Sequence, residues 1–245
     1  MCIVAIAHLA SSRYPLIVAA NRDERHLRDT APALWWSGEG SLLAGRDLEA
    51  GGTWLGVTGT GRFAAVTNIF VGLREAGARS RGALVTEFLQ GSATPAEFAA
   101  AVERNAMQYG PFNLLLRDGA ALEFVSNRHP MESLGPGIHV FSNNAPGLEW
   151  NKVAVLGGKI RAAIDRDDIV DYLIESLSGP AARGSLEQAA DSIFVVGDDF
   201  GTRCTTVLTV DADGRARFVE QRFESGGVAG GRSEFEFKVA EPVSD

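Results

Sequence analysis

The sequence predicts an α+β fold in which one β-sheet packs on another, and three observations lead to this class. Short β-like runs occupy the first 70 residues and the C-terminal third, whereas helical patterns are confined to the middle of the chain. The runs over 2–8 and 16–20 are almost wholly apolar, which is typical of strands covered on both faces. Glycine makes up 28 of the 245 residues and punctuates the runs. This order of elements disfavours an alternating parallel sheet and favours a layered sandwich.

The N-terminal part is predicted to consist of strands joined by turns. The expected strands cover 2–8, 16–20, 42–45, 53–57 and 62–68. Gly59 and Gly61 stand in a G-x-G-x-x-A pattern, which binds dinucleotides only where the glycines lead a strand into a helix. Here they precede the β-like run RFAAVTNI. We therefore interpret the two glycines as a hairpin turn and expect no dinucleotide site.

Helices are expected between the two β-rich parts. One begins after Thr94, because Pro95 stands at the first helical position and Glu97 completes a capping box with Thr94. Two more helices are predicted over 82–89 and 168–177, the second with apolar residues at helical spacing. These helices are expected to cover the apolar strands.

The remaining strands lie between and after the helices. We expect them over 113–116, 121–126, 138–141, 193–196, 204–210, 215–221 and 233–239. Asp213 and Gly214 are typical of the tight turn of a hairpin. Because no internal repeat or linker is visible, we predict a single domain over 1–245.

The charge balance argues against nucleic-acid and membrane binding. The chain has 23 Lys and Arg against 31 Asp and Glu, a net charge of -8. Such a surface repels phosphate backbones and anionic lipids. No apolar run reaches the ~18 residues that span a bilayer, and the apolar start lacks the cationic segment of a secretory signal. We therefore expect a cytoplasmic protein with a small-molecule ligand.

Histidines and cysteines point away from metal and disulfide sites. The four histidines are scattered and have no partner at metal-ligand spacing. The two cysteines, Cys2 and Cys204, do not form the framework of a disulfide-rich protein. We expect no metal, no cofactor and a reducing environment.

Cys2 is the candidate nucleophile because of its position. If an aminopeptidase removes Met1, Cys2 carries both a thiol and a free α-amine. An α-amine has a pKa of about 7.7–8.0 and accepts the thiol proton at working pH, so that one residue supplies nucleophile and base. The alternative is a small buried residue that begins a strand.

Four polar residues, Asn21 to Glu24, follow the apolar run over 16–20. If this run pairs with the first strand, its end lies close to Cys2. Arg22 would then lower the pKa of the thiol, and Asp23 would hold the α-amine. The alternative is a plain turn, which Asn and Asp also favour.

These residues carry a family resemblance. Met1-Cys2, the tetrad NRDE over 21–24 and the segment GTR over 201–203 resemble the NRDE family, also called the transport-and-Golgi-organisation family. More distantly, the chain is similar to the choloylglycine hydrolase and penicillin V acylase branch of the N-terminal-nucleophile hydrolases. The resemblance covers essentially the whole chain. It implies a four-layer αββα sandwich.

The resemblance also implies roles for single residues. Cys2 matches the nucleophile of the hydrolase branch, and Arg203 resembles its late Arg at the head of a strand. Arg22 and Asp23 resemble an Arg and an Asp that follow the second strand of the hydrolases. Those enzymes separate the two residues, whereas here they are adjacent.

Asparagines are the implied donors to an oxyanion. Asn68, which ends AAVTN, resembles the oxyanion-hole Asn of the hydrolases, and Asn144, in NAPGLEW, is similar in spacing to their N-S-P-x-x-x-W segment. Asn143 is the rival of Asn144. Each Asn taken alone is better explained as a turn at a strand end, and only the combination with Cys2 and Arg203 favours the functional interpretation.

Four further residues are assigned to substrate binding: Asn21, Glu24, Trp54 and Asn143. Trp54 would line an apolar acyl pocket, with burial in the core as its alternative.

Together these features predict an N-terminal-cysteine amidohydrolase. Its substrate would be the linear carbon–nitrogen bond of an acylated small molecule. The alternative, implied by the family, is a protein that binds and passes on a hydrophobic ligand such as haem, acyl-CoA or a lipid without catalysis.

Overall fold

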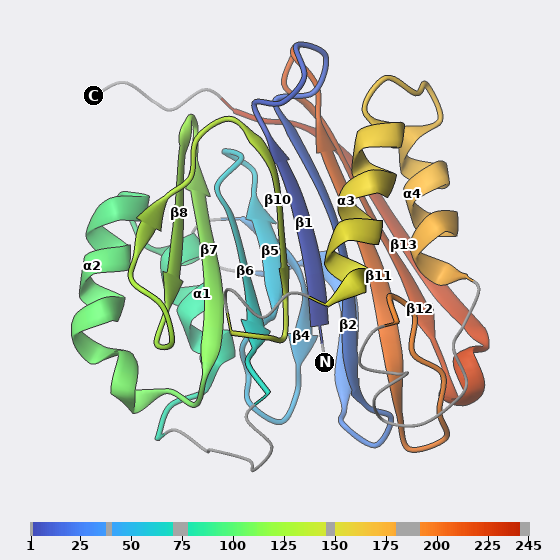
Figure 1. Cartoon of the computed structure of the whole chain (residues 1–245), viewed down its shortest axis with the longest axis horizontal. Coiled ribbons are helices and arrows are strands. Elements are labelled where there is room, and N and C mark those ends of the chain that lie inside the picture. The colour runs from blue at the N-terminus through green and yellow to red at the C-terminus, as the bar shows by residue number, and fades with distance from the viewer. Residues whose placement is uncertain (1, 38–40, 71–77, 146–149, 180–191, 241–245) are drawn as a thin grey trace. The chain divides into compact units, whose positions relative to one another are not determined.

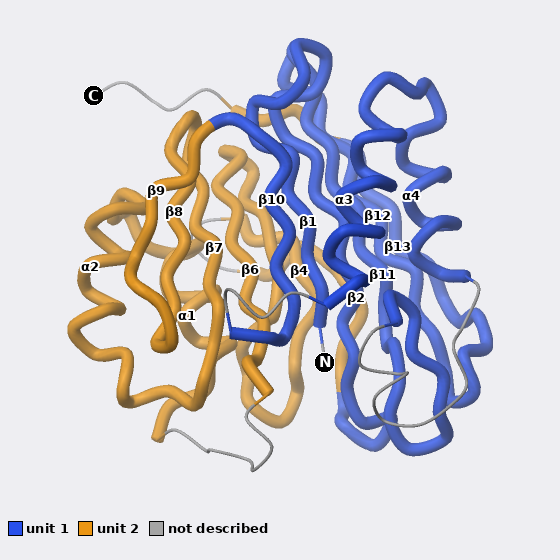
Figure 2. The backbone as a smooth tube through the Cα atoms, in the orientation of Figure 1, with its two compact units in different colours: residues 1–29, 136–236 blue, residues 30–135, 237–245 orange. Residues whose placement is uncertain are grey.

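A computed structural model describes residues 2–37, 41–70, 78–145, 150–179 and 192–240 (Figure 1). The chain forms two compact units, each built from two separate stretches of sequence (Figure 2). Unit 1 comprises residues 1–29 and 136–236, and unit 2 comprises residues 30–135 and 237–245. Our prediction of one domain over 1–245 stays a prediction.

Unit 1 is organised around a six-stranded sheet with the order β10-β1-β2-β11-β12-β13. Its strands are β1 Cys2–His8, β2 Leu16–Arg25, β10 Gly137–Ser142, β11 Phe200–Val210, β12 Arg215–Phe223 and β13 Ala229–Lys238. The chain start therefore lies inside the sheet, because β10 flanks β1 on one side and β2 flanks it on the other.

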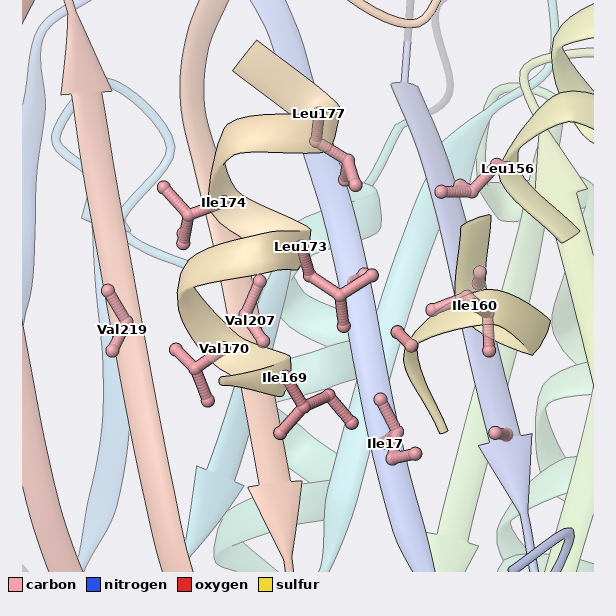
Figure 3. Close-up of a cluster of buried hydrophobic side chains, with 14 of the residues drawn as sticks. Ile17, Leu156, Ile160, Ile169, Val170, Leu173, Ile174, Leu177, Val207 and Val219 are labelled. Atoms are coloured by element: carbon pink, nitrogen blue, oxygen red, sulfur yellow. The ribbon is translucent and has the colours of Figure 1, made fainter. Parts of the chain in front are cut away.

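Two helices, α3 (Asn151–Ala163) and α4 (Ile169–Ser178), cover one face of this sheet. Side chains alternate along a strand, so Ile17 of β2 and Val207 of β11 meet Ile160 and Leu173 of the helices (Figure 3). All four are fully buried. Burying each such side chain stabilises the fold by roughly 1.5–3 kcal/mol, which holds the helical layer on the sheet.

Unit 2 contains a seven-stranded sheet with the order β3-β4-β5-β6-β7-β8-β9. Its strands are β3 Thr30–Trp35, β4 Leu42–Asp47, β5 Leu55–Thr58, β6 Phe63–Asn68, β7 Phe112–Asp118, β8 Ala121–Ser126 and β9 Glu132–Ser133. The helices α1 (Arg81–Gln90) and α2 (Pro95–Asn105), with the short 3-10 turn η1 (Ala106–Gln108), pack on it. Phe88 of α1 and Phe112 of β7 lie fully buried in that layer.

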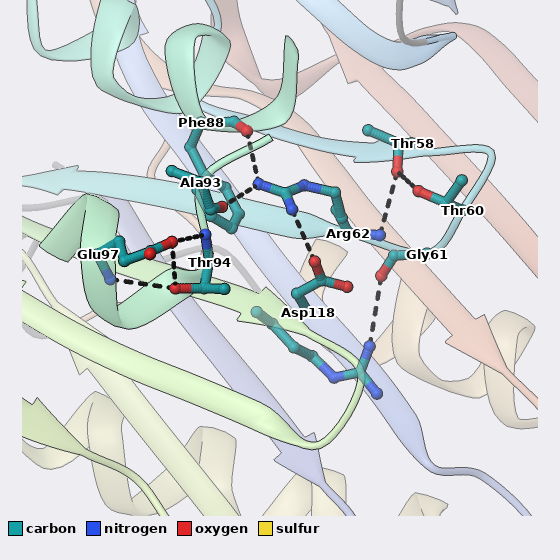
Figure 4. Close-up of polar contacts among 10 residues, drawn as sticks. Thr58, Thr60, Gly61, Arg62, Phe88, Ala93, Thr94, Glu97 and Asp118 are labelled. Atoms are coloured by element: carbon teal, nitrogen blue, oxygen red, sulfur yellow. Dashed lines mark hydrogen bonds and ion pairs between the residues drawn. The ribbon is translucent and has the colours of Figure 1, made fainter. Parts of the chain in front are cut away.

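Arg62 joins the sheet of unit 2 to its helices (Figure 4). Its guanidinium donates to Asp118 at 2.7 Å and to the carbonyls of Phe88 and Ala93 at 3.0 and 2.8 Å. The same group lies 4.3 Å from the centre of the Phe88 ring. One cation therefore holds the end of α1 and the entry to α2.

The predicted start of α2 is confirmed. The hydroxyl of Thr94 accepts from the Glu97 backbone at 3.3 Å, and the Glu97 carboxylate accepts from the Thr94 backbone at 2.9 Å (Figure 4). Both halves of the capping box are present, with Pro95 at the start of the helix. The hydrogen bonds that the Glu97 carboxylate accepts from the Thr94 backbone and from the Thr94 hydroxyl, the latter at 2.8 Å, lower the pKa of Glu97 below its usual value.

The hairpin turns are also confirmed. The turn at Gly59–Gly61 joins β5 to β6, and Gly61 has a φ of 81° that favours glycine. Gly214, with a φ of 77°, turns β11 into β12. A strand follows Gly61, so the interpretation as a hairpin rather than a dinucleotide motif is correct.

Several elements differ from the prediction. The tetrad NRDE does not follow the second strand but lies inside it, because β2 continues to Arg25 and pairs with β1 and β11 on its two sides. The helix α3 and the edge strand β3 were not predicted. The strand expected over 193–196 is wrong, since these residues form only bends and a single bridge.

No helix of the described ranges is both long and apolar enough to cross a membrane.

Candidate functional site

A row of side chains crosses the unit 1 sheet at the start of the chain. Arg22 of β2 is paired directly with Cys2 of β1 and with Cys204 of β11, and Cys204 is paired with Arg222 of β12. Directly paired residues point to the same face of a sheet. The Arg22 side chain, only 5% exposed, therefore lies between two thiols.

The two thiols of this row differ in exposure. Cys2 is half-buried and Cys204 is buried. Burial, aided by the charge of Glu220, raises the pKa of Cys204 well above its usual value, against the opposing charge of Arg22. A disulfide between them is excluded, because they are two strands apart, about 10 Å, and a disulfide spans at most about 7 Å between Cα atoms. Cys204 is therefore a neutral thiol, and Cys2 is the accessible one.

Asp23, the next residue of β2, is a buried carboxyl group with 3% exposure. Its Oδ1 accepts from the Thr202 hydroxyl at 2.7 Å. Burial raises the pKa of Asp23, while the Thr202 hydrogen bond and the charges of Lys152 and Arg22 act in the opposite direction. Two cations and a hydroxyl therefore surround this acid.

Asn143 lies at the end of β10, on the other side of β1. Ser142 is paired with Ile3, so Asn143, one residue further, stands at the level of Cys2. Asn143 is 1% exposed, and its Oδ1 accepts from the ammonium group of Lys152 at 3.1 Å. Within the part of the chain that the structure describes, its Nδ2 has no hydrogen-bond partner. A buried amide donor thus stands at the end of the strand that flanks the strand of the candidate nucleophile.

Lys152 is a site residue that the sequence analysis missed. It occupies the first turn of α3, is 1% exposed, and its Nζ lies 4.5 Å from the centre of the Trp150 ring. A lysine at a helix start is ordinarily a surface residue, and no residue pattern distinguishes this one. Only its neighbours in space show that it belongs to the group.

Asn21 makes hydrogen bonds that stabilise the fold. Its Nδ2 donates to the carbonyls of Leu177 and Ile193 at 3.0 and 2.8 Å, and its Oδ1 accepts from the Thr205 hydroxyl at 2.7 Å. These bonds tie β2 to the end of α4 and to β11. These contacts explain the presence of Asn21 without any role in substrate binding. The predicted binding of a substrate by Asn21 stays a prediction.

Arg203 and Glu24 also make contacts near the end of β2. The Arg203 Nη1 donates to the carbonyls of Arg25, His26 and Arg28 at 2.9, 3.0 and 3.1 Å. Glu24 accepts from the Arg25 backbone at 2.9 Å. Arg203 thus stabilises the turn that follows β2, and its predicted role at the cysteine stays a prediction.

The remaining predicted site residues are Asn144, Asn68 and Trp54. Asn144 is half-buried, and its backbone donates to the Ser142 hydroxyl at 3.3 Å. The segment 146–149 of the NAPGLEW motif lies outside the described residues. Asn68, the last residue of β6, and Trp54, which precedes β5, both belong to unit 2. Their roles remain predictions.

Comparison with known proteins identifies the family. A family model described as Transport and Golgi organisation 2 matches residues 1–225. The chain belongs to this family. Curated relatives from Bos taurus and Homo sapiens, both named Transport and Golgi organization protein 2 homolog, are each 30% identical to it, and each match covers 90% of this chain and 92% of the relative.

Two solved structures show the fold. An orthologue of N-acylethanolamine-hydrolyzing acid amidase from Caenorhabditis elegans aligns with a TM-score of 0.55 and 13% identity over 84% of this chain and 92% of its own. A mutant conjugated bile acid hydrolase from Clostridium perfringens aligns with a TM-score of 0.52 and 8% identity over 100% and 99%. The predicted fold class, the αββα sandwich of the N-terminal-nucleophile hydrolases, is confirmed.

The group in unit 1 has the parts that acyl transfer requires. It contains a half-exposed thiol, a cation beside it, a buried acid and a buried amide donor, contributed by Cys2, Arg22, Asp23 and Asn143. No cluster of three or more metal-ligating side chains occurs in the described ranges.

Proposed function

We propose that this protein is an N-terminal-nucleophile amidohydrolase that cleaves a linear amide of an acylated small molecule. The observation that carries the proposal is the position of Cys2, which is half-exposed, is paired directly with Arg22 of β2 and stands at the level of Asn143 at the end of β10. Removal of Met1 would leave Cys2 with a free α-amine. The site then holds a nucleophile, a base and an oxyanion donor.

The reaction follows from these groups. The thiol proton passes to the α-amine, and the Cys2 sulfur attacks the amide carbonyl carbon, forming a C–S bond while the carbonyl electron pair moves to oxygen. The C–N bond then breaks, and the amine leaves with the proton from the α-ammonium group. Water hydrolyses the thioester and releases the carboxylic acid.

Two adjacent residues of β2, Arg22 and Asp23, interact with the thiol and the α-amine of Cys2, respectively. Because neighbours on a strand face opposite ways, Arg22 shares the face of the Cys2 side chain, whereas Asp23 lies on the face toward α3 and α4. Arg22 stabilises the thiolate, and Asp23 holds the α-ammonium group from the other side. The adjacency of Arg and Asp in NRDE is therefore compatible with the roles that the hydrolases give to separated residues.

The amide donor of Asn143 stabilises the oxyanion. A donor aimed at the developing charge contributes about 3 kcal/mol to lowering the barrier. Asn143 takes the role that the sequence analysis assigned first to Asn144 and Asn68. Asn143 is favoured because its Oδ1 is engaged by Lys152 and its Nδ2 is buried without a partner among the described residues.

The substrate class is supported by the two solved structures. Their names state hydrolysis of N-acylethanolamines and of conjugated bile acids, both of which are acyl amides of small molecules. The net charge of -8 does not favour polyanionic substrates.

A direct test combines intact mass with an amide screen. The purified chain is weighed to establish loss of Met1 and is then incubated with N-acylethanolamines and acyl–amino acid conjugates, with amine release as the readout. Turnover that disappears in Cys2→Ala and persists in Cys204→Ala supports the proposal. Cys204 is the matched control, because it is the thiol on the other side of Arg22.

The non-catalytic alternative makes the opposite prediction. A carrier of haem, acyl-CoA or lipid would bind these ligands equally well in Cys2→Ala and would release no amine from any amide. That combination of results would replace the hydrolase by a carrier.

A further inference from the structure

Lys152 is unusual in being a buried cation at the N-terminus of a helix. A lysine is almost never fully buried, and a cation at a helix start opposes the positive end of the helix dipole. Lys152 is 1% exposed in the first turn of α3, where Trp150 provides no side-chain cap and no acidic residue is present. Departures of this kind are expected at functional sites.

Three neighbours offset the cost of burying this ammonium group. Its Nζ donates to the Asn143 Oδ1 at 3.1 Å and lies 4.5 Å from the centre of the Trp150 ring. The Asp23 carboxyl group also experiences its charge. Lys152 is therefore held in a defined place by Asn143 and Trp150, and its charge acts on Asp23; the proposed function assigns Asn143 to the oxyanion and Asp23 to the α-amine.

The contact with Lys152 determines which way the Asn143 amide points. An ammonium group has donors and no acceptor, so only the Oδ1 of Asn143 can face it. The Nδ2, on the other arm of the planar carboxamide, must then point away from the ammonium group, and it is buried without a partner among the described residues. An unsatisfied buried donor destabilises the fold, and a bound oxyanion removes that cost.

We propose that Lys152 is a positioning residue that holds the Asn143 carboxamide with its N–H group toward the oxyanion formed at Cys2. This inference rests on the proposed hydrolase function and adds a residue to it. The ammonium group also withdraws electron density from the amide oxygen, which strengthens the N–H group as a donor. Asn143 is placed by the register of β10 at the level of Cys2.

The first variant to measure is Lys152→Met, with Lys159→Met on the same helix as its control. We expect kcat for the best amide substrate to fall about 100-fold, as for a misplaced reacting group, with KM within about twofold, because the amide acts on the transition state. In the double variant with Asn143→Ala, Lys152→Met should have no further effect on kcat. Additive losses would assign Lys152 a role that does not pass through Asn143 and would overturn the inference.

If Lys152→Met does not fold, Asn143→Asp provides a second test of the proposed role of the Asn143 donor. A carboxylate retains and strengthens the contact with the ammonium group but has no N–H donor. We expect an unchanged or higher melting temperature together with a loss of kcat of about 10²–10³-fold. A retained kcat would overturn the inference, since it would mean that the donor is not used.

The two proposals fail in different ways. If the wild-type chain, shown by mass to begin at Cys2, hydrolyses no amide, then both the hydrolase function and the role of Lys152 are overturned. If the wild-type chain is active and Lys152→Met is equally active, then only the role of Lys152 is overturned.

Discussion

The helices α2 and α3 begin in opposite ways. In unit 2, α2 starts with a complete capping box of Thr94 and Glu97. In unit 1, α3 starts at Trp150 without such a cap and carries the buried Lys152 in its first turn. The start of α2 has the cap that stabilises a helix, whereas the start of α3 lacks such a cap and places a buried cation there. The difference separates residues kept for stability from residues that we assign to chemistry.

The largest expected effect concerns the proposed catalytic group in unit 1. Cys2→Ala should lower amide turnover by at least about 10⁴-fold, because it removes the nucleophile, and should leave the unfolding midpoint unchanged. Steady-state rates and chemical denaturation measure the two quantities. Cys204→Ala is the control, and equal losses of activity in the two variants would show that the row around Arg22, and not Cys2 itself, is required.

Arg62→Met tests the region that leads into α2. The variant loses hydrogen bonds to Asp118 and to the carbonyls of Phe88 and Ala93, so we expect the free energy of unfolding to fall by about 2–3 kcal/mol. The rate per folded molecule should not change. Urea denaturation provides the measurement, and Arg104→Met on the surface of α2 is the control. A specific loss of activity would contradict the division between the two regions.

Thr94→Ala removes the cap of α2 alone. Loss of an N-cap side chain costs about 1 kcal/mol, and we expect a shift of that size in urea denaturation, with no change in kcat or KM. Ser92→Ala, at an exposed position just before the helix, should have no effect. A shift equal in both variants would mean that the capping box does not stabilise α2.

The smallest effects are pH dependences of opposite sign. The pKa of Glu97 is lowered by its hydrogen bonds with Thr94, so its stabilisation is present above its unfolded pKa near about 4.3 and is lost as the pH falls. The pKa of Asp23 is raised by burial. Its stabilisation is therefore present below its unfolded pKa near about 3.9 and is lost as the pH rises through the folded value.

Thermal unfolding from acid to neutral pH distinguishes the two groups. As the pH rises, Glu97→Gln should become less stable relative to the wild-type chain, whereas Asp23→Asn should become more stable relative to it. The gain in Asp23→Asn should accompany a loss of amide hydrolysis. Shifts of the same sign in the two variants would contradict the contrast between the two regions.

Local signals allowed much of the fold to be predicted. The capping box before Pro95 and the glycines at the turns, Gly61 and Gly214, act within a few residues of themselves, and the elements beside them are confirmed. The helix α3 lacks a cap and contains two adjacent glycines, which lower helix propensity. The edge strand β3 contains Pro32, which is tolerated at an edge but disguises the strand in the sequence.

The candidate site was only partly open to prediction, because its geometry depends on pairing between distant segments. NRDE has the residues of a turn, yet it belongs to a strand, because β11 pairs with the whole tetrad and β1 pairs with Asn21 and Arg22. Cys2, Arg22 and Asp23 were singled out through their position and type. The pairing of Lys152 with Asn143 depends on how α3 packs on the sheet, and nothing in the local sequence of either residue indicates it.

Rapid-quench mass spectrometry during turnover of an acyl amide tests the assignment of Cys2 most directly. We predict a chain that lacks Met1 and carries the acyl group of the substrate on the thiol of its first residue, in an amount that falls as the substrate is exhausted. A turning-over sample whose N-terminal peptide retains Met1, or whose Cys2 never carries the acyl group, would contradict the assignment.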